Sequence, residues 1–164
     1  MVESTNEKKH TTSKINLPIE IIRPKIQTIP FIFTSPHSGT NYTSEFIKAS
    51  ALDALYLRKS EDSFIDELYD HAPKSGAPLL RAVYPRAYID LNREAYELDP
   101  TMFEDTLPDF VITASPRISA GLGTIPKIVS SGYEIYNTKL KFKDAEERIN
   151  RCYFPYHTAL KNLI

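Results

Sequence analysis

The sequence has little cysteine, little glycine and almost no excess charge, and these shortages exclude several classes of protein. Cys152 is its single cysteine, which excludes an internal disulfide framework and favours a reducing, cytoplasmic location. A net charge of −1 gives no support for binding to nucleic acid or to anionic membranes. No apolar run reaches 18 residues, and the amino-terminal segment lacks the apolar core of a signal peptide.

The composition that remains is that of an ordinary soluble domain. The 164 residues are 41% hydrophobic and 25% charged, which is enough for one domain with its own core. Twelve prolines against five glycines indicate many fixed turns. We expect residues 1–16, which are polar, to form a disordered tail, and residues 17–164 to form the domain.

Apolar patterning predicts an alternation of short strands and helices, and therefore an α/β protein. Short apolar runs predict strands over 19–22, 31–33, 78–83 and 87–91. Helical spacing predicts one or two short helices within 43–57, a helix over 60–72 with Ser60 as its N-cap, and a last helix from about 143 to the end. Pro155 is expected to kink that last helix near 151–154. Cys152 is interpreted as a buried apolar residue of this helix rather than a nucleophile.

The segment around His37 is the first candidate for chemistry. Pro36 has no N–H and ends any strand pairing, so His37 follows the carboxyl end of a buried strand. Gly39 allows the chain to turn sharply there. Ligands of open α/β sheets bind at this edge, so His37 is a candidate metal ligand or base. The alternative is a loop histidine bonded to a backbone carbonyl.

Two further polar pairs fall at the ends of predicted elements. Glu61 and Asp62 begin a predicted helix, and Asn92 and Arg93 follow a predicted strand. Zinc takes imidazole and carboxylate ligands, and arginine's planar fork suits a substrate carboxylate. Together these groups describe hydrolysis of an amide on an acidic amino acid. Taken singly, the acids are a helix cap and the Asn-Arg dipeptide has no role.

Several motifs in order resemble the N-formylglutamate amidohydrolase family. They are Ser-Pro-His-Ser-Gly at 35–39, Ser-Glu-Asp-Ser-Phe-Ile-Asp-Glu-Leu-Tyr at 60–69, Arg-Ala-Tyr-Ile-Asp-Leu-Asn-Arg-Glu at 86–94, Glu-Leu-Asp-Pro at 97–100, Ala-Gly-Leu-Gly-Thr-Ile at 120–125 and Tyr-His at 156–157. The resemblance implies an open mixed sheet flanked by helices, of the zinc-exopeptidase-like type. It also implies hydrolysis of N-formyl-L-glutamate to glutamate and formate, or of a related N-acyl amino acid.

The same resemblance implies roles for particular residues. His37 and Asp62, or Glu61 in its place, would bind Zn²⁺, while Asn92 and Arg93, with Arg86 as a helper, would bind the substrate's carboxylate. Members of this family continue into a later histidine that completes the metal site, and the sequence ends on an apolar helix face without it. We therefore expect a domain cut before its last strands. The alternatives are a partner that supplies the rest, or a catalytically inactive remnant that still binds carboxylates.

Overall fold

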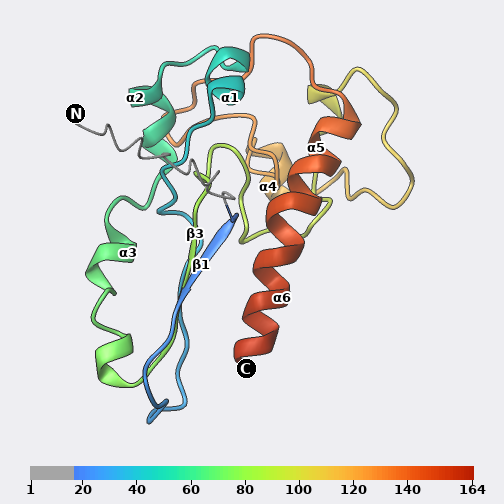
Figure 1. The fold of residues 1–164 in the computed structure, drawn as a ribbon. Helices are drawn as coiled ribbons and strands as arrows, with labels where there is room; N and C mark the ends of the chain where they lie inside the picture. Colours follow the sequence, from blue (N-terminus) through green and yellow to red (C-terminus); the bar gives the residue numbers. More distant parts are fainter. Residues whose placement is uncertain (1–16) are drawn as a thin grey trace, which may run out of the picture.

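The computed structural model describes residues 17–164, and its centre is a small mixed sheet (Figure 1). The strands are β1 (Ile19–Ile22), β2 (Phe33–Ser35) and β3 (Leu79–Ala82), in the order β1-β3-β2. β1 runs antiparallel to β3, and β2 runs parallel to it. The chain therefore leaves β2 and β3 at the same edge of the sheet. The tail predicted over 1–16 lies outside the described residues.

Short helices surround this sheet. α6 packs against β3 and α3 against β2, on the right and the left of the sheet in Figure 1. The α-helices are α1 (Ser44–Ala49), α2 (Ala54–Leu57), α3 (Ile65–Leu68), α4 (Pro116–Ser119), α5 (Phe142–Arg148) and α6 (Phe154–Leu163). Single turns of 3₁₀-helix cover Arg58–Ser60, Pro73–Ser75 and Pro100–Met102. The open mixed sheet with flanking helices agrees with the prediction.

Two predicted strands differ from the structure. The strand expected over 31–33 begins at Phe33 and runs to Ser35, and Phe31 is 62% exposed. The segment 87–91 is not a strand, because Pro85 begins a turn in which its carbonyl accepts the N–H of Tyr88 at 2.9 Å. Its apolar side chains still enter the core, so the burial was predicted correctly and the backbone conformation was not.

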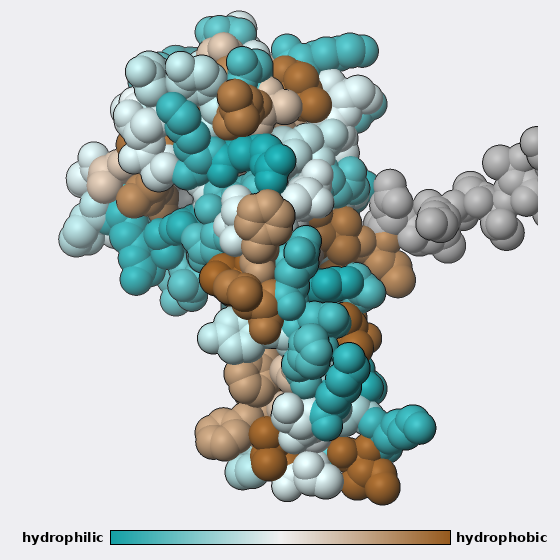
Figure 2. All heavy atoms as spheres, turned by 90° about the vertical axis from the view of Figure 1, so that its left-hand side faces the viewer, coloured by the Kyte–Doolittle hydropathy of each residue, from teal (hydrophilic) through white to brown (hydrophobic). Residues whose placement is uncertain are grey.

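The helix predicted over 60–72 is reduced to the single turn α3. Phe64 has φ = 66°, a left-handed conformation that interrupts the helix. Before it, the N–H of Asp62 donates to the carbonyl of His37 at 3.2 Å, and the Ser38 hydroxyl donates to the carbonyl of Asp62 at 2.7 Å. These tertiary bonds hold Asp62 in an extended loop. Leu68 is 72% exposed, and Figure 2, which faces the α3 side, shows apolar patches among polar surface.

The last helix is interrupted where proline predicted it. Between α5 and α6 the chain forms a π-helical turn over Ile149–Tyr153, and Pro155 is the second residue of α6. Because Pro155 lies in the first turn of α6, its missing N–H leaves no regular α-helical hydrogen bond unmade. Cys152 is buried as predicted, and burial raises the pKa of its thiol to about 12.

The core has two parts. The larger joins the sheet to the last helices through residues such as Leu80, Ile89 and Ile149. The smaller lies between α1, α2 and the 129–135 segment. None of the helices within residues 17–164 combines the length and apolar character needed to span a bilayer.

Candidate functional site

His37 lies in the loop that follows β2 and is only 6% exposed. The loop is fixed by a hydrogen bond of 2.7 Å between the Ser35 and Ser38 hydroxyls. Its backbone also packs tightly on the segment after β3, since a Cβ on Gly39 would overlap the carbonyl oxygen of Tyr84. Gly39 is therefore needed for close approach of two backbone segments, in addition to the turn predicted there.

Both ring nitrogens of His37 meet a carboxylate. Nδ1 lies 3.3 Å from Oδ2 of Asp62, and Nε2 lies 2.8 Å from Oδ1 of Asp90. The two carboxylates differ in exposure, because the Asp62 side chain is 51% exposed and that of Asp90 is 2% exposed. The ring is thus held by a buried acid on one side and faces an accessible acid on the other.

Asp90 contacts several residues of the site at once, although it is not among the candidates predicted from the sequence. Its Oδ2 accepts a hydrogen bond from Arg86 Nε at 3.0 Å and lies 3.4 Å from Arg93 Nη2. Its Oδ1 also accepts the backbone N–H of Asn92 at 2.9 Å. Burial alone raises the pKa of Asp90, but the hydrogen bond and charge of His37 and the charge of Arg86 outweigh it and lower this pKa to about 2. An acid inside the apolar run 87–91 was the signal available in the sequence.

The predicted carboxylate-binding residues separate into two environments. The Arg93 guanidinium is 9% exposed and donates to the backbone carbonyls of Leu122 at 2.8 Å and Asn92 at 2.7 Å. Arg86 is 25% exposed, and its Nη1 lies 4.0 Å from Oδ1 of Asp62. Asn92 is exposed. Arg86 therefore presents more accessible positive charge than Arg93.

Glu61 points away from His37. Its Oε1 accepts a hydrogen bond of 2.6 Å from the Tyr42 hydroxyl, and its Oε2 pairs with Arg58 Nε at 3.1 Å. Burial and the Glu61 carboxylate together raise the pKa of Tyr42. Of the two neighbouring acids, it is Asp62 that the structure brings to the imidazole.

A hollow of about 320 Å³ adjoins this cluster. Its charged wall is formed by Asp62, Arg86 and Asp90, and Lys59 and Glu61 also line the hollow. The lining also includes the apolar side chains of Leu122, Ile128 and Val129. Such a combination of a few convergent polar groups with apolar walls is typical of small-molecule sites.

The donor set fits part of a zinc site. Two atoms about 2.1 Å from one ion and 3.3 Å apart subtend about 100° at it, close to the tetrahedral angle, and this is the separation of His37 Nδ1 from Asp62 Oδ2. Asp90 on the far nitrogen is the carboxylate that metal-binding histidines usually have. Residues 17–164 nevertheless contain no group of three or more His, Cys, Asp or Glu side chains that could hold a metal.

The fold is that of an α/β protein, and the candidate site lies where its two parallel strands end, the edge at which open α/β sheets bind ligands. Residues 29–164 match the family model of N-formylglutamate amidohydrolase. The chain therefore belongs to the N-formylglutamate amidohydrolase family.

Two relatives indicate how much of a family member this chain spans. It is 30% identical to an N-formylglutamate deformylase of Pseudomonas aeruginosa over 105 residues. The matched segment covers 63% of this chain and 39% of that protein. The crystal structure of N-formylglutamate amidohydrolase from Ralstonia eutropha JMP134 matches with a TM-score of 0.81 and 35% identity, over 89% of this chain and 51% of that one. The chain thus spans about half the length, or less, of these relatives. That the domain is cut before its last strands stays a prediction.

Proposed function

We propose that residues 29–164 carry part of the active site of a zinc-dependent amidohydrolase acting on N-formyl-L-glutamate or a related N-acyl amino acid. The observation that carries the proposal is His37, held by Asp90 at one nitrogen and 3.3 Å from Asp62 at the other. This pair occurs in a chain whose relatives are named for deformylation or amide hydrolysis of N-formylglutamate.

In this proposal His37 and Asp62 hold the metal, and Asp90 keeps the imidazole ring in place. When bound, zinc supplies a Lewis acid that polarises the amide carbonyl and acidifies water. Two protein donors make a weak zinc site, so a third comes from outside the described residues, either from further chain or from a partner.

In this proposal the charged wall of the hollow binds the substrate. Arg86 binds the substrate's carboxylate, because its guanidinium is accessible and is oriented by Asp90. Arg93 acts mainly as a positioning residue, since its donors already hold the carbonyls of Asn92 and Leu122. Leu122 and Val129 keep water away from one side of the bound molecule.

A second candidate function is carboxylate binding without catalysis. It is favoured by the absence of a three-ligand group within residues 17–164. Because Arg86 and Asp90 pair directly at 3.0 Å, this wall of the hollow needs no metal to keep its shape.

Zinc affinity of single variants tests the metal ligands. We expect His37→Ala and Asp62→Asn each to lower the affinity for zinc by about tenfold or more, because each removes a ligand. Glu61→Gln is the matched control, since Glu61 is one residue away and bonds to Tyr42 instead. Competition with a chromophoric chelator measures all three. An unchanged affinity in His37→Ala would remove His37 from the metal site.

Activity and binding separate the two functions. A zinc-loaded amidohydrolase releases formate from N-formyl-L-glutamate and loses this activity with EDTA. A binding module shows no formate release, yet binds glutamate in EDTA by calorimetry and loses that binding in Arg86→Gln. Formate release that persists in EDTA would contradict the metal-dependent proposal.

A further inference from the structure

Arg148, the last residue of α5, is a buried cation outside the site described above. It is 9% exposed, and its Nη1 donates to the carbonyl of Tyr88 at 3.2 Å and to the hydroxyl of Tyr136 at 2.6 Å. In contrast to the other arginines of the interior, it has no carboxylate within 4.0 Å in the described part of the chain. Asp144, one helical turn earlier, accepts instead from the backbone N–H of Lys141 at 3.3 Å.

Aromatic rings surround this guanidinium in place of an acid. Its central carbon lies 4.4 Å from the ring centroid of Tyr88, 5.5 Å from that of Tyr136 and 5.6 Å from that of Phe46. Ring faces attract cations, but more weakly than a buried carboxylate does. The charge of Arg148 is therefore stabilised inside the protein, with a contribution from the charge of Asp144 that helps to raise its pKa, but no carboxylate lies in direct contact with it among the described residues.

A hollow of about 400 Å³ lies against Arg148. Its lining includes the apolar groups of Phe46, Ala49 and Leu140, together with Arg148 at a buried position. The acids that also line it are exposed ones, among them Glu147, whose side chain is 66% exposed and whose Oε1 lies 3.8 Å from Nζ of the exposed Lys143. Arg151, an exposed arginine that bonds to the Tyr84 hydroxyl, also lines the hollow. The hollow thus combines a buried positive group, an apolar wall and outer charged groups, of which three are negative and one is positive.

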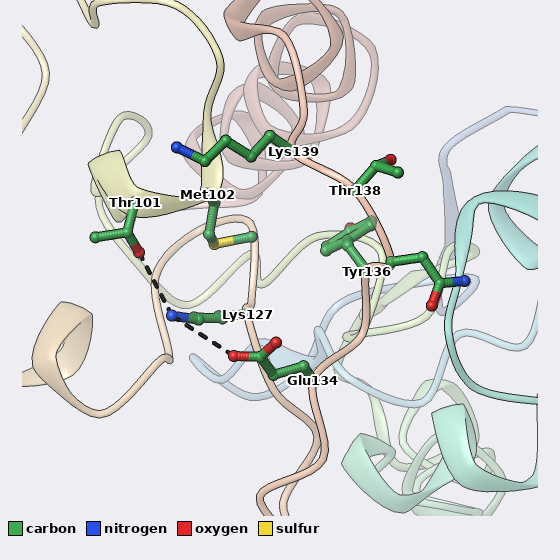
Figure 3. A pocket seen from close by; sticks show the side chains of 8 residues that line it. Thr101, Met102, Lys127, Glu134, Tyr136, Thr138 and Lys139 are labelled. Atoms are coloured by element: carbon green, nitrogen blue, oxygen red, sulfur yellow. Dashed lines mark hydrogen bonds and ion pairs between the residues drawn. The ribbon is translucent and has the colours of Figure 1, made fainter.

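A second polar hollow, around Lys127, shows what is different about Arg148. Lys127 Nζ lies 3.7 Å from Glu134 and 3.9 Å from Asp99, and Figure 3 shows it between Thr101 and Glu134. Lys127 of that hollow is therefore matched by acids of the protein, whereas Arg148, the buried cation of its own hollow, has no carboxylate within 4.0 Å among the described residues.

We propose that the Arg148 hollow binds a free α-amino acid with an apolar side chain. The carboxylate meets the guanidinium, which is suited to planar, two-point binding of carboxylates. The ammonium lies toward the outer acids, with Glu147 as its main partner, and the side chain lies against Phe46 and Leu140. The outer acids disfavour phosphate and other polyanions, because like charges repel.

This site is separate from the His37 cluster and does not depend on the proposed amidohydrolase function. The two sites are connected through the segment 86–90 and through Tyr42, which bonds to Glu61 and stacks on Phe46. Tyr88 receives the bond from Arg148, and Arg86 and Asp90 flank it two residues away on either side. Binding to the Arg148 hollow is therefore measurable while the metal site is empty or disrupted.

Calorimetry of the full chain in EDTA, with three matched probes, tests the proposal. L-Leucine carries both charges, 4-methylpentanoate lacks the ammonium, and 3-methylbutylamine lacks the carboxylate. We expect leucine to bind at least about tenfold more tightly than either analogue, since each lost contact is with a charged group. The same binding is expected in His37→Ala. Tighter binding of inorganic phosphate than of leucine would overturn the proposal.

Variants of the hollow assign the contacts. Arg148→Met should weaken leucine binding at least about tenfold, with far-UV circular dichroism confirming that the variant folds. Glu147→Gln should weaken leucine binding and strengthen binding of 4-methylpentanoate. Glu146→Gln, the neighbouring acid outside the lining, is the control and should change neither. Leucine binding that is unaffected by both Arg148→Met and Glu147→Gln, or that is not detected up to millimolar protein, would refute the site.

Discussion

Two buried charged clusters of this protein, one around Asp90 and one around Arg148, stabilise their ions by different means. Asp90 is surrounded by donors, namely His37, Arg86, Arg93 and the backbone N–H of Asn92. Arg148 is surrounded by aromatic rings, with one carbonyl and one hydroxyl as its acceptors. In the first cluster opposite charges are paired, and in the second a single charge lies among polarisable groups.

The difference predicts which cluster tolerates replacement. Removing one member of a buried ion pair leaves its partners charged and unpaired, which costs more than the pair contributed. A buried ion with no ionic partner leaves nothing charged behind when it is removed. We therefore expect the Asp90 cluster to be sensitive to substitution and the Arg148 cluster to be tolerant.

The largest expected effect is that of Asp90→Ala. It leaves the buried Arg93 and the partly buried Arg86 without their carboxylate, so we expect a loss of about 3–5 kcal/mol in the free energy of unfolding. Denaturant titration measures this loss. Asp90→Asn is the control, because it keeps the shape and one acceptor and should cost less. A loss below about 1 kcal/mol in Asp90→Ala would contradict the pairing.

The same carboxylate makes stability depend on acid. The pKa of Asp90 is about 2 in the folded protein and 3.8 ordinarily. Because the folded value is the lower one, the contribution of Asp90 to stability is present above about pH 4 and is lost as the pH falls toward 2. Asp90→Asn should therefore lose less stability than the wild type between pH 4 and pH 2.

A smaller effect is expected from Gly39→Ala, in the backbone that supports the Asp90 cluster. The new Cβ would overlap the carbonyl of Tyr84, so the His37 loop must move, at a cost of about 1–3 kcal/mol. Gly132→Ala is the matched control. It has φ = 82° but nothing within 4 Å of its Cβ, so only backbone strain of about 1–2 kcal/mol applies.

Zinc affinity distinguishes these two glycines more clearly than stability does. Gly39→Ala displaces His37 and should weaken zinc binding, whereas Gly132→Ala should leave it unchanged. Equal zinc affinities in the two variants would show that the His37 loop tolerates the added methyl group without moving the imidazole.

The sequence predicted the position of the site better than its contacts. The parallel pairing of β2 with β3 places the His37 loop and the segment containing Arg86 at one edge of the sheet, whereas the expected strand over 87–91, which was to carry Asn92 and Arg93 to that edge, does not form. Asp90 was missed because its apolar neighbours indicated a strand, in which it would be one buried residue among several. Its role depends on the turn at Pro85, which brings it back to His37.

Around Asp62 a regular element was predicted that does not form, whereas at Asp90 a functional residue was missed. Local spacing predicted a helix there, and tertiary bonds from the His37 loop prevent it. The energy of these bonds depends on residues more than 20 positions away, which local patterning does not contain. The resulting loop is what allows Asp62 to face the imidazole while Glu61 turns to Tyr42.

The smallest expected effect belongs to Arg148→Met, and it decides whether the two clusters truly differ. Methionine preserves an unbranched apolar stem against Tyr88 and Phe46. The lost attraction to the rings, about 0.5–2 kcal/mol, is offset by removing a buried charge. We expect the free energy of unfolding to stay within about 1 kcal/mol of the wild type. A loss as large as that of Asp90→Ala would contradict the proposed difference between the two clusters, since removing Arg148 leaves only the neutral acceptors of Tyr88 and Tyr136 without their donor.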